Sequence, residues 1–478
     1  MKFCVSDLAR IQCRDFHRPL TISKNVAVAN LIDSRRLSLA MEHEEADFVA
    51  KHPKSQQLSR QAKEGLLSGV PMPWMVRWPG AFPLFVDNAQ GSSFTCADGH
   101  AYVDFCLGDT GAMTGHSVEA LSTAVGAQLK RGLTTMLPTA DAQWVANNLS
   151  ERFGLPKWQF AMTATDANRF VLRFARHLTK RPKIVVHDWC YHGTVDETLV
   201  VLDADGRTVS RPGAIGPQVD PGLTTVAVPF NDLYAMEEAL ASGDIACVLM
   251  EPALTNIGIV LPKDGYVQGV RELTRNYDAL LIIDETHTIC AGPGGCTREW
   301  SIDPDFVVIG KTIGGGIPVA AYGMSAEIAR RLEALMVGHD LDVSGVGGTL
   351  TGSALAMSAM KATLSSSLLE NDFEQTIGLA KSWAEGVKSV CTEFDLDWHV
   401  QQLGCRAEYW FCPPPANGAQ AAASVNPELE AYLHLAALNR GILLTPFHNM
   451  ALFSVFHKID DVDKHTGVFR DCIAAIAS

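Results

Sequence analysis

Short apolar runs alternate with amphipathic segments through the middle of the chain. Apolar runs that predict strands lie at residues 183–187, 224–228, 245–250, 279–284, 306–309 and 318–323. Segments that predict helices lie at residues 118–131, 141–153 and 166–180. Strands separated by helices are typical of βαβ units that form a mostly parallel sheet. The central part of the chain therefore predicts an α/β fold.

The two flanks of this central part have different patterns. Residues 38–64 are charged and helix-tolerant, and runs at 84–86, 93–96 and 101–105, separated by turn residues, predict an antiparallel meander. Near the C-terminus, the pattern predicts a helix at 427–440, a strand at 441–444 and a terminal helix, with a low-complexity loop at 416–424. We expect an N-terminal arm (1–65), the first part of a small domain (66–115), a large domain (116–345) and the rest of the small domain (346–478).

Composition narrows the class of protein. The 478 residues carry a formal net charge of −14, which disfavours general binding to nucleic acids or anionic membranes. No apolar run approaches the ~18–20 residues of a membrane span, and the first 20 residues predict an irregular arm rather than a signal peptide, with a transit peptide left open. The 12 cysteines contain no C-x-x-C pair, which favours a reducing, cytoplasmic location. Small-molecule chemistry is the class that remains.

One lysine follows a predicted buried strand directly. The strand at 306–309 leads into the glycine-rich turn Gly310-Lys311-Thr312-Ile313-Gly314. A phosphate loop of the pattern G-x-x-x-x-G-K-[ST] is excluded, because position 305 is Asp instead of Gly. Burial disfavours the charged form of a lysine, so Lys311 is a candidate Schiff-base amine. A surface lysine just past the strand end is the alternative.

A carboxylate ends a neighbouring predicted strand. Asp284 stands 27 residues before Lys311, at the end of the run at 279–284. The carboxyl ends of parallel strands share one edge of a sheet, where ligands of α/β proteins bind. Pyridoxal 5'-phosphate (PLP) needs this pair, a lysine for its aldehyde and a carboxylate for its ring nitrogen. The alternative for Asp284 is a helix cap.

With these motifs the chain resembles class III, fold-type I PLP-dependent aminotransferases, nearest to the glutamate-1-semialdehyde aminomutase branch. The resemblance implies a large domain with a mostly parallel sheet flanked by helices, and a smaller α+β domain. It implies Lys311 as the Schiff-base lysine and Asp284 as the partner of the ring nitrogen. The family's phosphate-binding Ser-Gly-Thr-Glu-Ala is similar to Thr163-Ala164-Thr165-Asp166-Ala167 here. Its amides at a helix N-terminus suit a phosphate dianion.

Further cofactor contacts follow from the resemblance. The family's Tyr-His-Gly corresponds to Tyr191-His192-Gly193, with the tyrosine ring expected to stack on the cofactor. The resemblance also implies cofactor contacts for Glu251, for Asn256 in the aminomutase-like Asn-x-Gly, and for Thr286, which replaces the family's valine beneath the ring. Thr349 is expected to reach the cofactor phosphate of a second protomer, which implies a homodimer with shared active sites. A plain glycine-rich turn is the alternative for Thr349.

The substrate side departs from the family pattern. Met75 stands where the family's Gly-Val-Asn-Ser-Pro-Val-Arg has its arginine, so Arg77 and Arg406 are the remaining candidates for a carboxylate contact. Trp74 predicts an aromatic wall, and Asp109 is expected to hold a cationic or hydroxylated substrate or to cap a turn. β-Amino-acid relatives resemble Ser-Pro-Arg-Gly where this chain has Thr445-Pro446-Phe447-His448, so no arginine is present there, and His448 is the substrate candidate of this segment. His287 replaces an apolar residue, and we expect a packed or supporting role. His187, Cys190 and His192 lack a fourth ligand, so no metal site is predicted.

These observations predict a PLP-dependent aminotransferase that moves an amino group from an amine or amino acid to a keto acid by a ping-pong mechanism. In it, Lys311 serves as general base and acid. The first alternative is an intramolecular 2,1-aminomutase of the glutamate-1-semialdehyde type, which the Asn256-Ile257-Gly258 motif favours. The second is a cofactor-free binding protein, which the retention of both Asp284 and Lys311 disfavours.

Overall fold

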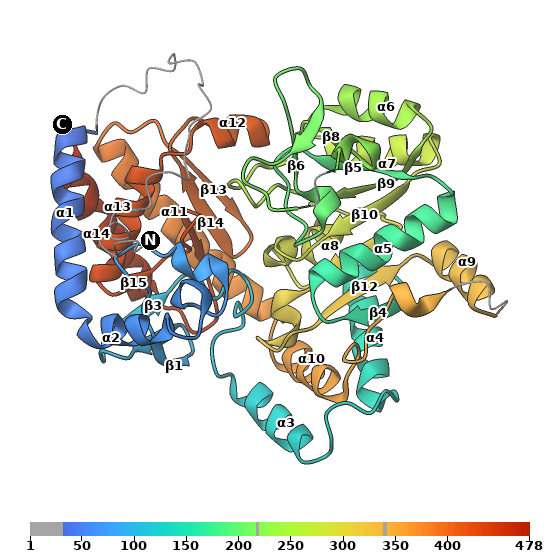
Figure 1. Ribbon diagram of the computed structural model, residues 1–478, viewed down its shortest axis with the longest axis horizontal. Helices are drawn as coiled ribbons and strands as arrows, with labels where there is room; N and C mark the ends of the chain where they lie inside the picture. Colours follow the sequence, from blue (N-terminus) through green and yellow to red (C-terminus); the bar gives the residue numbers. More distant parts are fainter. Residues whose placement is uncertain (1–31, 217–218, 338–341) are drawn as a thin grey trace, which may run out of the picture.

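The computed structural model describes residues 32–216, 219–337 and 342–478. The arm expected at residues 1–20 lies outside the described residues. Figure 1 shows a larger lobe built on a seven-stranded sheet and a smaller lobe that contains α1 (Ser34–Lys51) and α14 (Ile459–Ile476). No helix in the described ranges combines the length and apolarity needed to cross a bilayer.

The large sheet has the strand order β4-β12-β11-β10-β9-β5-β8. Its strands are β4 (Lys157–Ala161), β5 (Lys183–His187), β8 (Thr225–Val228), β9 (Ile245–Met250), β10 (Leu280–Asp284), β11 (Phe306–Ile309) and β12 (Ala320–Met324). The pairs from β8 to β11 are parallel, and β12 runs antiparallel to both of its neighbours. The predicted, mostly parallel sheet is confirmed. The prediction missed β4, whose alternating exposed and buried residues are typical of a half-covered strand.

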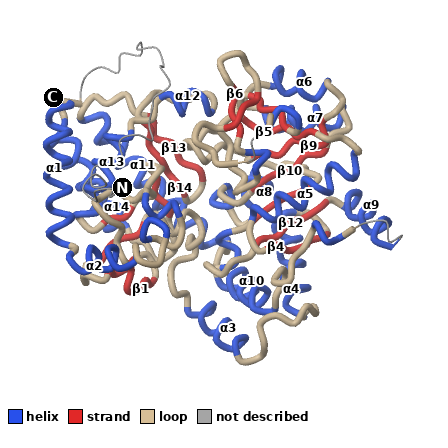
Figure 2. Tube along the Cα trace, viewed as in Figure 1, coloured by secondary structure: helices blue, strands red, loops and turns tan. Residues whose placement is uncertain are grey.

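Helices cover both faces of this sheet (Figure 2). Along β10, Leu281 and Ile283 belong to one apolar cluster, and Leu280 and Ile282 to the other. The first cluster includes side chains of α4 (Ala140–Phe153), α6 (Leu233–Ala241), α7 (Tyr266–Asn276) and α10 (Ala354–Ser366). The second includes side chains of α5 (Ala164–Thr179) and α9 (Ala326–Val337). Because both faces are covered, the strands are continuous apolar runs, which made them visible in the sequence.

Two small sheets form the second lobe, in the orders β1-β2-β3-β15 and β13-β14-β16. Their strands are β1 (Val86–Gln90), β2 (Ser93–Cys96), β3 (Ala101–Asp104), β13 (His399–Leu403), β14 (Arg406–Trp410), β15 (Ile442–Leu443) and β16 (Met450–Leu452). The helices α1, α2 (Pro53–Ala62), α11 (Glu370–Glu393), α13 (Pro427–Asn439) and α14 accompany them. The remaining elements are α3 (Glu119–Leu129), α8 (Gly295–Glu299), α12 (Gly418–Ala423), β6 (Val200–Leu202) and β7 (Thr208–Ser210).

Three local predictions differ from the structure. The expected loop at 416–424 contains the helix α12, because the Asn417 side chain caps its first turn and alanine favours helix. The first meander strand begins at Val86 and includes residues expected to turn. Helix α10 packs against α3 and α4 of the larger lobe, although the expected boundary at 345 assigns it to the small domain. The other domain limits stay predictions.

Candidate active site

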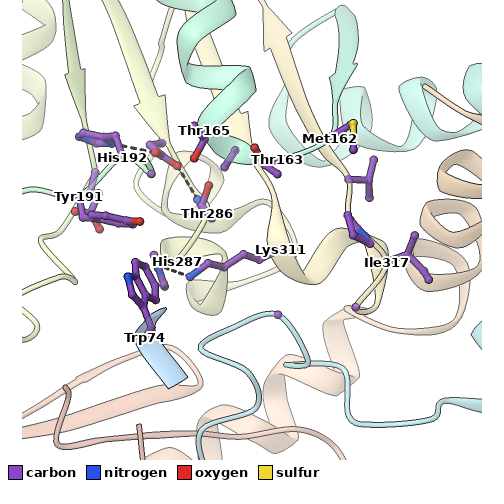
Figure 3. Close-up of a pocket in the computed structure, with 18 residues that line it drawn as sticks. Trp74, Met162, Thr163, Thr165, Tyr191, His192, Thr286, His287, Lys311 and Ile317 are labelled. Atoms are coloured by element: carbon purple, nitrogen blue, oxygen red, sulfur yellow. Dashed lines mark hydrogen bonds and ion pairs between the residues drawn. The ribbon is translucent and has the colours of Figure 1, made fainter. Parts of the chain in front are cut away.

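A cavity of about 280 Å³ lies at the carboxyl-end edge of the large sheet. Figure 3 shows side chains from several elements pointing into it. Its lining includes ten of the predicted site residues, namely Trp74, Thr163, Ala164, Thr165, Tyr191, His192, Glu251, Asp284, Thr286 and Lys311. The structure thus brings together groups spread over more than 200 residues of sequence.

Asp284, the last residue of β10, is held by three hydrogen bonds. Its Oδ2 accepts from the Asn168 amide at 2.9 Å and pairs with His192 Nδ1 at 2.9 Å, and its Oδ1 accepts from the Thr286 backbone at 3.1 Å. Burial by itself would raise the pKa of Asp284, but His192 and the other donors lower it to about 2. Asp284 is therefore a fixed, ionised carboxylate at the cavity edge.

His192 is charged through the same contact. Burial opposes a charged imidazole, but interactions with Cys190 and Asp284 raise the pKa of His192 well above its usual value. Its Nε2 is buried and has no hydrogen-bond partner. The sequence placed His192 near the cofactor, and its role as the partner of Asp284 was not predicted. Asn168, which directly follows the predicted phosphate motif, was also missed as a site residue.

Lys311 lies directly after β11, in a short 3₁₀ turn (Lys311–Gly314). Its Nζ is 2.8 Å from Asp109 Oδ2, 2.9 Å from the Asp109 backbone oxygen and 2.8 Å from His287 Nε2. Its backbone φ of 52° is in the left-handed region, which is uncommon for a residue with a side chain. The turn thus aims the amine into the cavity and toward Asp109 rather than into solvent.

The N-terminus of α5 forms a second, electropositive part of the cavity. Thr163 caps this helix, and the Thr165 hydroxyl accepts from the Thr194 backbone at 3.0 Å. A Cβ at Gly193, which has a φ of 80°, would stand 2.1 Å from that hydroxyl, so a glycine is needed beside the helix end. Free amides at a helix N-terminus suit a phosphate dianion. Together with the ionised Asp284 and the amine of Lys311, the residues present fit PLP.

Of two other predicted cofactor residues, Glu251 lines the cavity and Asn256 does not. Glu251 follows β9 and lines the cavity, and burial raises the pKa of its carboxyl to about 7. The Thr255 hydroxyl donates to its Oε2, while its Oε1 is buried without a partner. Asn256 is not among the cavity-lining residues, and its amide donates to the Trp189 backbone at 3.1 Å. This placement fits the alternative for Asn256, a turn residue, and its contact with the cofactor stays a prediction.

The expected substrate residues separate into two groups. Trp74 lines the cavity, with its ring centroid 5.9 Å from Tyr191 and 5.6 Å from Phe447, and its contact with substrate stays a prediction. The Asp109 side chain contacts Lys311 rather than only capping a turn. The other three do not line the cavity, and these are Arg77, Arg406 and His448.

Each of those three placements has a physical reason. The Arg406 guanidinium is fully buried, pairs with Glu408 at 2.9 Å and donates to the Thr255 backbone oxygen of the large lobe at 2.8 Å. His448 Nδ1 lies 3.2 Å from the other oxygen of Glu408. Arg77 is exposed at the end of the 3₁₀ turn Pro73–Val76. Thr349 is also exposed and does not line the cavity. Direct substrate contacts of Arg77, Arg406 and His448 within this chain are therefore not supported.

Six cavity residues from apolar or glycine-rich segments were not predicted. They include Met162, Gly316, Ile317, Pro318 and Val319, and Gly111 of the turn after Asp109 is the sixth. The glycines after Lys311 were part of the lysine motif, and the turn they form brings residues 316–319 to the cavity. In the described ranges, no three His, Cys, Asp or Glu side chains are grouped as a metal would need, and His187 bonds the Tyr266 hydroxyl at 2.8 Å.

The fold and this site define a fold-type I PLP-dependent enzyme, and its cofactor is PLP. The sequence profile described as aminotransferase class-III matches residues 75–393, about two thirds of the chain. The chain belongs to the class-III aminotransferase family.

Within this family, the chain is similar to aminomutases and, at lower identity, to a transaminase. The chain is 33% identical over 424 residues to a glutamate-1-semialdehyde 2,1-aminomutase of Methanothrix thermoacetophila, covering 87% of this chain and 95% of that protein. A crystal structure of a glutamate-1-semialdehyde aminomutase from Pseudomonas aeruginosa PAO1, in complex with PMP, has a TM-score of 0.91 and 46% identity, covering 93% of this chain and 100% of the other. An omega-transaminase from Sphaerobacter thermophilus has a TM-score of 0.80 and 26% identity, over 90% and 99% of the chains.

Proposed function

We propose that this chain is a PLP-dependent 2,1-aminomutase of the glutamate-1-semialdehyde type, which exchanges an amino and a carbonyl group within one substrate. The observation that carries the proposal is the similarity to aminomutases over nearly their whole length, at 33% and 46% identity for two of them. The Lys311 and Asp284 pair at one cavity supports it. The sequence predicted an intermolecular aminotransferase, with the aminomutase as the first alternative, and the relatives favour this alternative over the main prediction.

The residues of the cavity have separable tasks in this proposal. When bound, PLP supplies an electron-poor ring that stabilises negative charge on the neighbouring substrate carbon. Asp284 offers a fixed negative charge to a ring nitrogen, and the N-terminus of α5, with Thr163 and Thr165, holds a phosphate. Lys311 binds the cofactor and carries protons between neighbouring atoms with its Nζ.

A homodimer is part of the proposal. Exposed apolar side chains include Trp74 and Met75 in the turn at the cavity, 40% and 37% exposed, and Met136 and Leu137, 77% and 71% exposed. Such side chains are typical of surfaces that a partner covers. A second protomer that covers them also offers a place for the exposed Thr349 at the partner's cofactor. A cytoplasmic location belongs to the proposal as well, and the ten described cysteines, all free, support it.

A second candidate function is transfer of an amino group from an amine to a keto acid. One observation favours it: none of the described residues lining the cavity is an arginine. A substrate carboxylate therefore has no guanidinium partner within the described chain. An amine without a carboxylate needs none.

The two functions differ in their need for an acceptor. We expect the purified holoenzyme to convert glutamate-1-semialdehyde to the isomer with exchanged amino and carbonyl positions, with no keto acid present. The Lys311→Ala variant is the matched control. Transfer from amines to pyruvate or 2-oxoglutarate, without isomerisation, contradicts the aminomutase and supports the second candidate. Lack of both reactions with every compound tested contradicts both.

A further inference from the structure

Three acceptor atoms surround the amine of Lys311. Nζ lies 2.8 Å from Asp109 Oδ2, 2.9 Å from the Asp109 backbone oxygen and 2.8 Å from His287 Nε2. Figure 3 shows Lys311 extended toward His287, with Trp74 nearby. This end of the cavity is built to hold a nitrogen that donates hydrogen bonds.

His287 accepts rather than donates toward Lys311. Burial, and then the charge of Lys311, lower the pKa of His287 to about 3, so its imidazole is neutral. Its Nδ1 is 3.0 Å from the Thr110 hydroxyl. With the proton on Nδ1 donated to Thr110, Nε2 has a free lone pair for the amine.

The Asp109 backbone adopts an uncommon conformation. Leu107, Gly108, Asp109 and Thr110 have φ values of 44°, 58°, 51° and 81° in succession. Side chains make this left-handed region unfavourable, and such strain concentrates at functional sites. Asp104 Oδ1 accepts from the backbone amides of Cys106 and Leu107 at 2.9 Å each and fixes the start of this turn. The strained turn brings both the carboxylate and the backbone oxygen of Asp109 to the lysine.

The charge of Asp109 depends on this lysine. Burial alone would raise the pKa of Asp109, but the positive charge of Lys311 holds it well below its usual range. The nearby Arg406 is already paired with Glu408. Asp109 Oδ1 is buried without a hydrogen-bond partner. When the Lys311 nitrogen is engaged by the cofactor, the carboxylate therefore has spare capacity for another cationic nitrogen.

We propose that Asp109 and His287 form an ammonium site that holds the Lys311 amine when it is free and a second amino group of the substrate when it is not. The inference rests on the proposed function. Exchange of amino and carbonyl positions within one molecule requires a stage at which the substrate carries nitrogen at both positions. When Lys311 is joined to the cofactor, this doubly aminated substrate is unattached, and one of its two ammonium groups can occupy the place that the lysine has left. The ligand class is therefore a small diamine.

The site can be tested without catalysis in the full-length Lys311→Ala protein, freed of cofactor by dialysis. We expect calorimetry to show saturable binding of methylammonium, which takes the place of Nζ, and at least tenfold weaker binding when Asp109→Asn is added. Asparagine tolerates the left-handed backbone, so the turn is retained. Tetramethylammonium, a cation without N–H donors, is the matched ligand control. Absence of methylammonium binding, or equal binding by the two proteins, overturns the proposal.

Adding His287→Met to Lys311→Ala gives an independent variant in case the asparagine protein does not fold. It removes one acceptor and keeps the carboxylate, so we expect methylammonium binding to weaken about threefold. Unchanged binding removes His287 from the site.

The second test uses the holoenzyme and two amines of the same size, 1,3-diaminopropane and butylamine. The rate at which each discharges the visible absorption of lysine-bound cofactor is measured in a single turnover. We expect the diamine to react at least tenfold faster in the wild type and equally fast in Asp109→Asn. Asp141→Asn, whose carboxylate pairs with Lys361 at 2.7 Å, is the control and keeps the preference. An unchanged preference in Asp109→Asn overturns the proposal. If neither amine reacts with the wild type, the isomerisation of glutamate-1-semialdehyde still decides the proposed function, and the methylammonium test still decides the site.

Discussion

Two carboxylates serve the same cavity from opposite kinds of structure. Asp284 ends a regular parallel strand, and both of its oxygens are hydrogen-bonded to residues of the large lobe. Asp109 lies in a strained turn after β3, and one of its oxygens has no partner. The sheet thus supplies a carboxylate, Asp284, whose position is fixed by hydrogen bonds to protein groups. The turn supplies a carboxylate, Asp109, that keeps one oxygen available for a ligand.

The residues around the two carboxylates also differ in how many hydrogen bonds they make. On the sheet side, Asn168 and His192 complete the contacts of Asp284. On the side of the small lobe, Arg406 is fully buried, and its Nε and Nη1 have no partner. Buried hydrogen-bond donors without partners lower the stability of the fold. The small-lobe side is therefore the part of the site in which fewer hydrogen bonds are made.

Lys311→Ala is expected to have the largest effect, because Lys311 faces Asp109 and is the candidate covalent and proton-carrying group. We expect the turnover rate to fall by about 10⁴-fold or more, the upper end of the range for a lost acid–base group. The visible absorption of lysine-bound cofactor should disappear as well. Spectra and single-turnover rates measure both effects. A variant that keeps the absorption contradicts the assignment of Lys311.

Arg406→Met tests whether Arg406, on the small-lobe side of the site, stabilises the fold rather than contacting substrate. The substitution leaves Glu408 buried without its guanidinium, so we expect a loss of about 3–5 kcal/mol in the free energy of unfolding. Denaturant titration of the holoenzyme measures this loss. The control Arg406→Met/Glu408→Leu removes both charges and should recover most of it. Unchanged stability with a raised KM would instead make Arg406 a substrate contact.

Asp284→Asn tests the sheet side in the same way. The amide keeps the size of the side chain but removes the negative charge, so we expect a turnover rate lower by about 10²-fold, as for the loss of one fixed electrostatic contact in an active site. Lys311 should still bind the cofactor, and retention of the visible absorption is the control. A rate within about threefold of the wild type would contradict the role of Asp284.

Glu251→Gln should change how stability depends on pH. Burial raises the pKa of the folded-state carboxyl to about 7, from 4.5 in its ordinary state. The folded protein therefore holds this proton more tightly than the unfolded chain. The resulting contribution to the free energy of unfolding is complete below about pH 4.5 and is lost as pH rises through 7. The variant lacks this group, so its stability relative to the wild type should rise between those values, by roughly 3 kcal/mol. Urea titrations across this pH range measure it, and a flat difference would contradict the raised pKa.

The sheet side was largely predictable because its information is local. The strands β9 and β11 occupy the residues that their apolar runs predict. Asp284 and Lys311 end or follow such runs, and parallel strands bring their carboxyl ends to one edge. By contrast, β4 was missed because it alternates exposed and buried residues and so is not a continuous apolar run. Helix α12 was missed because low complexity was taken to indicate a loop.

The small-lobe side could not be predicted because its contacts join distant residues. Asp109 and Lys311 are 202 positions apart, and no local pattern indicates their pairing. Arg406 was expected to be a substrate contact, because the sequence shows an arginine but not the adjacent Glu408 as its partner. Likewise, the apolar run at 183–187 predicted a strand but could not show that the histidine that follows it, His192, pairs with Asp284.

The sequence by itself determined the strands, the family resemblance and the two groups that PLP requires, since alternation and strand-end residues are encoded over a few positions. Only the tertiary structure decided which charges meet. Ion pairs depend on distances of a few ångströms between segments that the fold alone brings together. That is why the sequence left Asp109 a choice between ligand and turn cap, and the structure placed it 2.8 Å from the lysine.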